Sequence, residues 1–164
     1  MIKKSSRRMV GLAVAVSLAL VACGDDAVEP EPNLFGPNPR DVEFAASLGI
    51  DLDAMIETAS GLFYRDDLVG TGELAANGDE VTLTYTGSLV DSAVFDSGEL
   101  TVTLGVTNLI AGFAEGVLGM QLGGTRTIVI PSNLAYGSQG TGFIPPDAVL
   151  VFEITITALV KAPA

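Results

Sequence analysis

The chain of 164 residues contains no histidine and only one cysteine. Without histidine, a serine- or cysteine-based catalytic triad lacks its general base, and one cysteine supplies neither a cysteine-pair zinc site nor an intrachain disulfide. The sequence also lacks a glycine-rich loop that ends in Lys-Ser or Lys-Thr, which excludes a phosphate-binding P-loop. We therefore expect either an enzyme that uses no nucleophile or a binding module, in both cases without metal or cofactor.

Basic residues are also scarce. The chain has 8 lysines and arginines against 20 aspartates and glutamates, which gives a net charge of −12. This excess of acidic residues argues against nucleic acid as a partner and against protein charge as the means of binding an anionic membrane. The simplest interpretation of the acidic excess is that it keeps the protein soluble. The alternative is that it binds a specific basic partner. The length suits one domain, and 48% hydrophobic residues can supply its core.

The N-terminus has the pattern of an export signal. Basic residues precede an uncharged stretch at 9–22, which is typical of a secretory signal peptide and too short to span a bilayer comfortably. The stretch ends in Leu20-Val21-Ala22-Cys23, which resembles the bacterial lipobox, where cleavage precedes an acylated cysteine. We expect residues 1–22 to be removed and Cys23 to carry the lipid that anchors the protein to a membrane.

Cleavage before Cys23 would change the net charge of the protein and leave Cys23 and Gly24 at its N-terminus. Four of the 8 basic residues are lost with the signal peptide, so the remaining four face all 20 acidic residues and the charge becomes −16. Gly24 stands where an aspartate acts as an inner-membrane retention signal in some bacteria. This favours the outer membrane of the bacterial cell envelope, with the domain facing the periplasm.

Two segments separate the anchor from the main domain. Residues 23–40 are rich in Pro, Asp, Glu and Asn, which predicts a solvated acidic tether. In residues 41–59, apolar residues recur at helical spacing and Asp51 is a candidate cap, so we expect two short helices. The apolar residues of this segment pack on their own domain, or else Phe44 and Met55 form a docking or dimer surface.

The second half of the chain shows the alternation of β-strands. Val81, Leu83 and Tyr85 alternate with polar residues, and residues 100–104 repeat the pattern. Residues 125–130 are β-branched at five of six positions, which also favours a strand. A long final strand at 149–160 is expected to occupy a central position in an antiparallel sheet. Its core-facing residues are predicted to be Leu150, Phe152, Ile154, Ile156 and Ala158.

One segment in this half has helical spacing. Leu109, Phe113 and Val117 fall on one stripe, Asn108 is a candidate cap, and glycines at 105 and 119 bracket the segment. A single short helix against a twisted antiparallel sheet gives an α+β domain.

A candidate binding surface lies between this helix and the last strand. Leu134-Ala135-Tyr136-Gly137 is followed by a short Gly/Ser/Thr loop and then by Phe143-Ile144-Pro145-Pro146. Two aromatic residues, a flexible loop and two rigid prolines around one surface suggest a shallow apolar binding site.

Six short motifs follow one another along the second half of the chain. They are Val81-Thr82-Leu83-Thr84-Tyr85-Thr86-Gly87, Phe95-Asp96-Ser97, Leu109-Ile110-Ala111-Gly112-Phe113, Leu134-Ala135-Tyr136-Gly137, Ile144-Pro145-Pro146 and Leu150-Val151-Phe152-Glu153. In this order they resemble the motifs of the FKBP-type peptidyl-prolyl cis-trans isomerases. The resemblance spans about residues 60–160, and we assign 60–162 to an isomerase domain. Together with the lipobox and the tether, the whole chain resembles bacterial lipoprotein members of that family.

The resemblance implies an FKBP-like α+β fold, with a twisted antiparallel sheet of five or six strands wrapped around one short helix and preceded by short N-terminal helices. The substrate site would lie between helix and sheet. Tyr85, Phe95, Phe113 and Phe152 would line a proline pocket, with Phe113 as its floor. Taken without the resemblance, each of these aromatic residues has a second interpretation as plain core.

The resemblance also implies polar roles and a rim. Ile110 would donate its backbone N–H to a substrate carbonyl, with Leu109 beside it, because donors at a helix start lack intrahelical partners. Tyr136 would hydrogen-bond a second carbonyl. Asp96 would lie beside the pocket and interact with the substrate or with the Tyr85 hydroxyl, the alternative being an Asx-turn residue. The lip of the pocket would be formed by Phe143 and Ile144.

The implied activity is cis-trans isomerisation of X-Pro bonds in exported proteins, which assists folding at the cell envelope and needs no cofactor. Substrates would be proline-containing unfolded or partly folded exported polypeptides, and macrolide inhibitors would be ligands. The alternative is a non-catalytic, lipid-anchored proline-peptide binding module or chaperone.

The sequence departs from many family members at three places. Phe113 stands where many have tryptophan, which predicts a different pocket depth and weaker macrolide binding. A short loop is expected between Asp96 and Leu100, without the basic residue that some members place near this aspartate. The loop at 138–142 is too short to hold an inserted chaperone domain.

Overall fold

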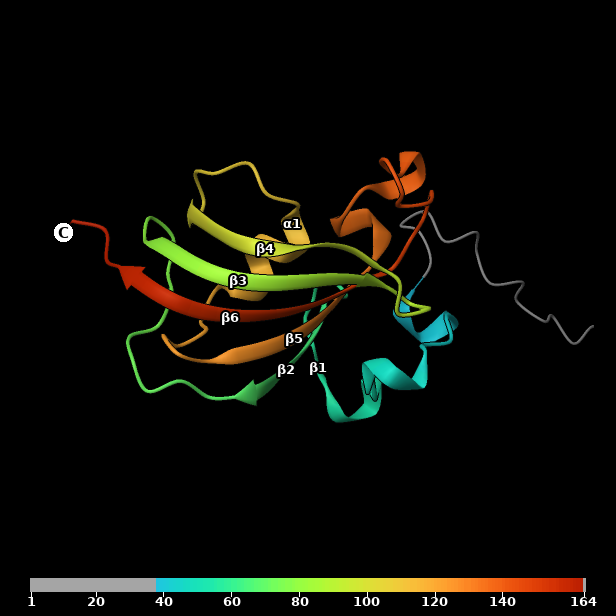
Figure 1. The fold of residues 1–164 in the computed structure, drawn as a ribbon, viewed down its shortest axis with the longest axis horizontal. Helices are drawn as coiled ribbons and strands as arrows, with labels where there is room; N and C mark the ends of the chain where they lie inside the picture. Colours follow the sequence, from blue (N-terminus) through green and yellow to red (C-terminus); the bar gives the residue numbers. More distant parts are fainter. Residues whose placement is uncertain (1–37, 164) are drawn as a thin grey trace, which may run out of the picture. The chain divides into compact units, whose positions relative to one another are not determined.

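The computed structural model describes residues 38–163 and forms one six-stranded antiparallel sheet with one α-helix. The strand order is β1-β2-β5-β6-β3-β4, so the long β6 occupies the predicted central position between β5 and β3. Figure 1 shows the twisted sheet with α1 across one face. The elements are β1 (Ile56–Glu57), β2 (Phe63–Leu68), β3 (Glu80–Leu89), β4 (Val94–Thr103), α1 (Ala111–Val117), β5 (Thr125–Ile130) and β6 (Leu150–Val160).

The main core lies between α1 and the sheet. Alternation along each strand directs one set of side chains toward the helix, and the buried members include Val81, Leu83, Ile128 and Ile154. Phe113 and Val117 of α1 close the core from the other side, and both are almost fully buried. The α+β fold predicted from the alternating pattern and the single helical stripe is therefore confirmed.

One predicted core residue of β6 is wrong. The sequence alternation places the side chains at 150, 152, 154, 156 and 158 on one face. Leu150, Phe152, Ile154 and Ile156 are indeed buried, but Ala158 is exposed. The register moves from Thr82↔Ala158 to Leu83↔Ile156, so β6 contains a bulge at this point. An extra residue inverts the alternation beyond it, and Leu159 packs against the core instead of Ala158.

The segment before the sheet consists of 3₁₀ turns rather than the two short helices expected between 41 and 59. The turns are Pro39–Asp41, Ala46–Leu48 and Leu52–Ala54. Gly49 ends the second turn in the left-handed conformation with φ +60°, and the Asp51 side chain caps the third, as its position suggested. Short 3₁₀ turns suit this segment because each needs only one or two hydrogen bonds before the chain changes direction.

These turns contribute to a second apolar cluster, separate from the main core. Met55 is buried in it with Phe63, Val129, Val149 and Val151. Partly buried side chains pack around this cluster, and those from the 3₁₀ segment and its flanks are Val42, Phe44, Leu48, Ile50 and Leu52. Of the two interpretations offered for this segment, packing on its own domain is the one the structure supports.

Helix α1 begins later than its sequence suggested. Ile110, in an extended conformation, occupies the cap position, and Asn108 does not cap the helix. Leu109 and Ile110 therefore belong to the connection that leads into α1. Two glycines seat the helix on β5: a Cβ on Gly112 would overlap the side chain of Ile130, and one on Gly116 would lie 2.7 Å from Ile128 Cδ1. The backbone of α1 thus lies directly on the side chains of the sheet.

Within residues 38–163, no helix has the length and apolar character needed to cross a membrane. The predicted signal peptide, Cys23 and most of the predicted tether lie outside the described residues.

Candidate functional site

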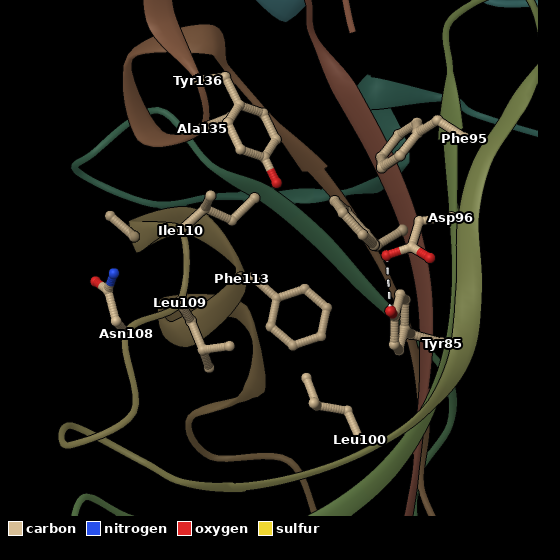
Figure 2. Close-up of a pocket in the computed structure, with 12 residues that line it drawn as sticks. Tyr85, Phe95, Asp96, Leu100, Asn108, Leu109, Ile110, Phe113, Ala135 and Tyr136 are labelled. Carbon is tan, nitrogen blue, oxygen red and sulfur yellow. Dashed lines mark hydrogen bonds between the residues drawn. The ribbon is translucent and has the colours of Figure 1, made fainter. Parts of the chain in front are cut away.

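A cavity of about 500 Å³ opens between α1 and strands β3, β4 and β6 (Figure 2). Its walls come from β3, β4, the connection into α1 with the start of that helix, the Ala135–Tyr136 corner, and β6. The lining residues are Tyr85, Phe95, Asp96, Leu100, Asn108, Leu109, Ile110, Ala111, Phe113, Ala135, Tyr136 and Phe152.

Aromatic rings form the apolar part of the cavity. Phe152 of β6 packs edge-to-face against Phe113 and Phe95, with ring centroids 5.2 Å and 5.5 Å apart. Tyr85 contacts Phe113 in the same manner at 5.9 Å. Edge-to-face pairs hold each ring in one orientation, because the positive edge of one ring meets the negative face of the next. The cavity wall is therefore a fixed apolar surface.

A bulge in β4 brings two consecutive side chains to the cavity. The pairing with β3 moves from Gly87↔Asp96 to Ser88↔Val94, which leaves Phe95 without a direct partner. In a regular strand Phe95 and Asp96 would face opposite sides, but the extra residue lets both line the cavity. This also corrects the expected loop between Asp96 and Leu100, because β4 runs without interruption from Val94 to Thr103.

The glycine opposite this bulge makes room for the rings. A Cβ added to Gly87 would lie 2.7 Å from Phe152 Cε1 and 2.7 Å from Phe95 Cζ. Real Cβ atoms do not approach a ring that closely, so any larger residue at 87 displaces one of the two rings.

The polar centre of the cavity is a hydrogen bond from the Tyr85 hydroxyl to Asp96 Oδ2, 2.7 Å long (Figure 2). This bond, together with partial burial and the negative charge of Asp96, raises the pKa of Tyr85 to about 12. Tyr85 therefore remains a protonated donor at every physiological pH, and its proton is committed to Asp96. Asp96 is a strand residue, and the Asx-turn interpretation does not hold.

Two further hydrogen-bonding groups face the same space. The Tyr136 ring lies above the cavity with its hydroxyl group directed into it (Figure 2). Ile110 precedes the first turn of α1, and its carbonyl accepts from the N–H groups of Phe113 and Ala114. Its own N–H has no acceptor in the described part of the chain, which leaves a donor at the edge of the cavity.

The predicted site residues are not all found together. Tyr85, Phe95, Asp96, Leu109, Ile110, Phe113, Tyr136 and Phe152 line the cavity. The two residues expected at its lip do not: Phe143 is 92% exposed, whereas Ile144 is 7% exposed and belongs to the main core. Thr141 and Ile144 exchange both backbone hydrogen bonds across a tight turn, which holds Phe143 outward and Ile144 inward.

Four lining residues were missing from the prediction. Leu100 was assigned only to an alternating strand, and Asn108 was assigned as a helix cap. Ala111 and Ala135 carry side chains too small to suggest a role. Both alanines did lie in motifs already singled out, Ala111 in Leu109-Ile110-Ala111-Gly112-Phe113 and Ala135 in Leu134-Ala135-Tyr136-Gly137.

The arrangement can bind a small apolar group and hold the polar backbone on either side of it. No group of three or more histidine, cysteine, aspartate or glutamate side chains among residues 38–163 is placed to hold a metal ion. What the cavity offers is removal of water by aromatic rings, together with donors from Ile110 and Tyr136.

Comparison with known proteins shows which family has this sequence and fold. The family model described as "FKBP-type peptidyl-prolyl cis-trans isomerase" matches residues 71–157. The chain is 44% identical to the "FK506-binding protein" of Neisseria meningitidis serogroup B over 102 residues, which cover 58% of this chain and 94% of that protein. It is 41% identical to the "Probable FKBP-type peptidyl-prolyl cis-trans isomerase FkpA" of the same organism over 65% of this chain and 41% of that protein.

Solved structures agree with the sequence comparison. The crystal structure of FkpA from Escherichia coli superposes with a TM-score of 0.62 at 33% identity, covering 67% of this chain and 53% of that one. A peptidyl-prolyl cis-trans isomerase from Pseudomonas syringae pv. tomato superposes with a TM-score of 0.62 at 30% identity, covering 71% of this chain and 87% of that one. The family match over residues 71–157, the identity with relatives and the shared sheet-and-helix architecture lead to one conclusion: this chain belongs to the FKBP-type peptidyl-prolyl cis-trans isomerases.

Proposed function

We propose that this protein catalyses cis-trans isomerisation of X-Pro bonds in exported polypeptides and so assists their folding at the bacterial cell envelope. The observation that carries the proposal is the cavity. Four aromatic rings surround its space, into which the Tyr136 hydroxyl points, and Ile110 lies at its edge. The catalytic residues of this proposal are Tyr85, Phe95, Asp96, Ile110 and Tyr136. Leu109, Phe113 and Phe152 bind the substrate.

The chemistry requires no nucleophile. Rotation about an X-Pro bond breaks amide resonance, with a barrier of about 20 kcal/mol and an uncatalysed time of about 10–100 s. The twisted amide is less polar than the planar one, so a site without water around the carbonyl favours the twisted form. Each ~1.36 kcal/mol of preferential binding to the twisted state accelerates the reaction about tenfold.

The residues of the cavity divide this task. The proline ring enters between Tyr85, Phe95, Phe113 and Phe152, whose edge-to-face contacts keep the apolar wall fixed. The N–H of Ile110 and the hydroxyl of Tyr136 donate to carbonyls on the two sides of the proline and hold the flanking chain while the bond rotates. Asp96 holds the Tyr85 hydroxyl and thereby orients the ring that forms one side of the pocket.

The cellular part of the proposal comes from the N-terminal sequence. The lipobox-like Leu20-Val21-Ala22-Cys23 supports acylation of Cys23, and the acidic segment that follows supports a tether between the membrane and the domain. Gly24 after the cysteine favours the outer membrane on its periplasmic side. Metabolic labelling with a fatty acid, followed by membrane fractionation, tests this part: label must be lost in Cys23→Ser, and an exclusively inner-membrane pool contradicts the outer-membrane assignment.

The enzymatic part is tested by measuring the exchange rate of an Ala-Leu-Pro-Phe peptide by NMR, with the purified protein and its Phe95→Ala and Asp96→Ala variants. Acceleration by the wild type that falls in both variants, while their circular dichroism spectra stay unchanged, supports the proposal. A folded wild type that binds the peptide without accelerating exchange contradicts it and favours the non-catalytic binding module. Titration calorimetry with a macrolide inhibitor then measures its affinity and tests whether Phe113 weakens macrolide binding.

A further inference from the structure

Strand β4 forms one edge of the sheet, because within residues 38–163 it pairs with β3 alone. It is ten residues long, from Val94 to Thr103. The strand at the opposite edge, β1, contains only two residues. Figure 1 shows β4 as the last of the long strands at its border of the sheet. This edge therefore offers a long row of backbone groups that face no partner strand.

The hydrogen bonds of Thr103 show which residues of β4 direct their backbone outward. Its N–H donates to Thr107 Oγ1 at 3.0 Å, and its carbonyl accepts from N–H groups of the loop that follows. In an antiparallel ladder the N–H and C=O of one residue point to the same side, and the side alternates from residue to residue. The register with β3 is regular from the bulge onward, so the other outward residues of this stretch are Ser97, Glu99 and Thr101.

The neighbouring strand agrees with this assignment. The carbonyl of Thr82, which pairs with Thr101, accepts from Thr157 Oγ1 of β6 at 3.1 Å and so points away from β4. The backbone groups of residues 97, 99 and 101 have no other hydrogen-bond partner in the described part of the chain, and all three residues are exposed. The edge thus presents alternating N–H and C=O groups over about 14 Å, at about 3.4 Å per residue.

The usual means of protecting an edge strand are absent from this stretch. Proteins commonly protect such edges with lysine or proline in the strand, with a bulge, or with a covering helix or loop. Strand β4 contains neither lysine nor proline, and its bulge is confined to Phe95. The loop that follows the strand satisfies Thr103. Residues 97–101 remain open between these two ends, with Glu99 as their single charged side chain.

We propose that the edge of β4 at residues 97–101 binds an extended polypeptide segment by strand addition, at a site separate from the cavity. The chemistry fixes the class of ligand, because donors and acceptors that alternate at the strand repeat match another extended backbone. The added strand would lie beside the hydroxyls of Ser97 and Thr101 on one face and beside Leu100 on the other, which favours uncharged, β-branched side chains in the ligand. Recognition through the main chain requires no proline, so this proposal does not depend on the isomerase function.

A second copy of the chain is the other candidate occupant of this edge, and charge argues against it. Each copy carries a net charge of −12, and Glu99 lies at the middle of the open stretch. Pairing of two such edges would bring two acidic surfaces together. An uncharged segment of another polypeptide meets no such repulsion. The ligand is therefore a different polypeptide, and self-association becomes one outcome of the test.

The test uses the purified protein and the proline-free peptide acetyl-Ser-Thr-Val-Thr-Val-Thr-Ser-amide. NMR titration gives the dissociation constant, and amide hydrogen exchange reports which backbone groups become protected. We expect slower exchange at the N–H groups of Ser97, Glu99 and Thr101. The N–H groups of Gly98 and Leu100 already point to β3, so their exchange should not change. The same peptide with N-methyl groups on its three central residues, which belong to both of its edges, should bind at least about tenfold more weakly.

Two variants at one position separate the backbone from the side chain. Glu99→Pro removes the central outward donor and leaves the bonds between β4 and β3 in place, because proline is tolerated where the N–H of an edge strand faces solvent. Glu99→Ala is the matched control, since it also lacks the carboxylate but keeps the N–H. The dissociation constant of the peptide should be about two- to tenfold higher for Glu99→Pro than for Glu99→Ala. If Glu99→Pro does not fold, the N-methylated peptide makes the same comparison with the wild type.

Three results would overturn the proposal. They are no binding of the proline-free peptide, equal affinity for its N-methylated form, and protection that leaves the outward N–H groups of β4 unchanged. Protection of these groups that grows with protein concentration in the absence of peptide would show self-pairing and overturn the choice of ligand. Because the peptide contains no proline, each of these results leaves the isomerase proposal standing. A wild type that fails to accelerate exchange of Ala-Leu-Pro-Phe would overturn the isomerase proposal alone.

Discussion

Arg126 Nη1 donates to the carbonyl oxygen of Gly116 at 2.9 Å, so a strand of the sheet holds the C-terminal end of α1 directly. The same nitrogen also donates to the carbonyl of Leu118 at 3.2 Å, and Nε pairs with Asp66 at 2.7 Å. The guanidinium group lies over the Tyr64 ring, 4.4 Å from its centroid. Carbonyls at the end of a helix lack intrahelical donors, and here a nearly buried arginine supplies them.

Replacement of Arg126 by methionine is expected to lower the free energy of unfolding by about 2–4 kcal/mol, because two carbonyls at a helix end lose their donor and Asp66 loses its partner. Urea denaturation measures the change. Arg65→Met is the control, since Arg65 is a third exposed and pairs with Asp67 near the surface, where removal of an ion pair costs at most about 1 kcal/mol. Equal losses in the two variants would contradict the role assigned to Arg126.

Asp96→Asn is expected to lower the pKa of Tyr85 from about 12 toward the ordinary tyrosine value of about 10, because the variant removes the charge-assisted hydrogen bond that is the largest cause of the shift. Ultraviolet absorbance of the phenolate follows the titration, and Tyr85→Phe identifies which step belongs to Tyr85. An unchanged titration in Asp96→Asn would show that burial alone raises the pKa.

The same shift predicts how stability depends on alkaline pH. Because the pKa of Tyr85 is higher in the folded than in the unfolded state, its hydrogen bond stabilises the fold fully below about pH 10. This contribution is lost as the pH rises from about 10 to about 12, where the folded protein also ionises. Wild type and Asp96→Asn should therefore converge in unfolding free energy at the upper end of this range.

Asp79 predicts the opposite dependence at acidic pH. Its 2%-exposed carboxylate accepts hydrogen bonds from Lys161 Nζ and from the N–H groups of Ala162 and Ala76, which ties the end of β6 to the turn before β3. These bonds, that from Lys161 first, hold the pKa of Asp79 below its ordinary value. The stabilisation is therefore present above the unfolded pKa of about 3.9 and is lost as the pH falls through the lower folded value.

Asp79→Asn should accordingly be less stable than the wild type at neutral pH, and the difference should shrink once the pH falls below about 4. Urea denaturation at a series of pH values measures the difference. Glu80→Gln is a suitable control, because Glu80 is the exposed neighbour of Asp79. A difference between wild type and Asp79→Asn that stays constant down to the acid limit would show that the ionised carboxylate is not the stabilising form.

Gly87→Ala is expected to reduce isomerase activity by displacing Phe95 or Phe152 and to cost about 1–3 kcal/mol of stability through overpacking. Activity falls because both displaced rings line the cavity. Gly98→Ala provides a matched control on the paired strand, since a Cβ there meets no atom within 4 Å. Peptide exchange rates and urea denaturation of the two variants test the prediction, which fails if both alanines behave alike.

Four of the six strands and the helix could be predicted from the sequence, whereas β1, β2 and the irregular positions were not predicted. Alternation identified β3, β4 and β6, and β-branched content identified β5, whose residues are almost all buried. The Leu109, Phe113 and Val117 stripe identified the helix. The bulges at Phe95 and near Thr157 were not predicted. A bulge is defined by the register with the partner strand and leaves no signal in the sequence of its own strand. As a result, Ala158 was placed on the wrong face and the continuous β4 was interrupted by a loop.

Site residues on regular elements were likewise predicted better than those at turns and helix ends. Residues on regular elements, such as Tyr85, Phe113 and Phe152, were predicted together and are found together. The turn between Thr141 and Ile144 separates two neighbours that the sequence treated alike, because a tight turn directs adjacent side chains to different environments. Asn108 has the composition of a helix cap, but the helix starts three residues later, and Asn108 lines the cavity instead.

The two glycines at which α1 contacts β5 also determine how the cavity can change when its lining residues are replaced. Gly112 and Gly116 let the helix backbone rest on Ile130 and Ile128, so these contacts, which do not involve the side chain at 113, hold the helix on the sheet. Exchange of Phe113 for a smaller or larger ring would therefore alter the depth of the cavity without moving Ile110 or Leu109 at its edge. Depth and rim are separable features in this architecture, and ligand selectivity can be adjusted by one side chain while the hydrogen-bonding geometry is kept.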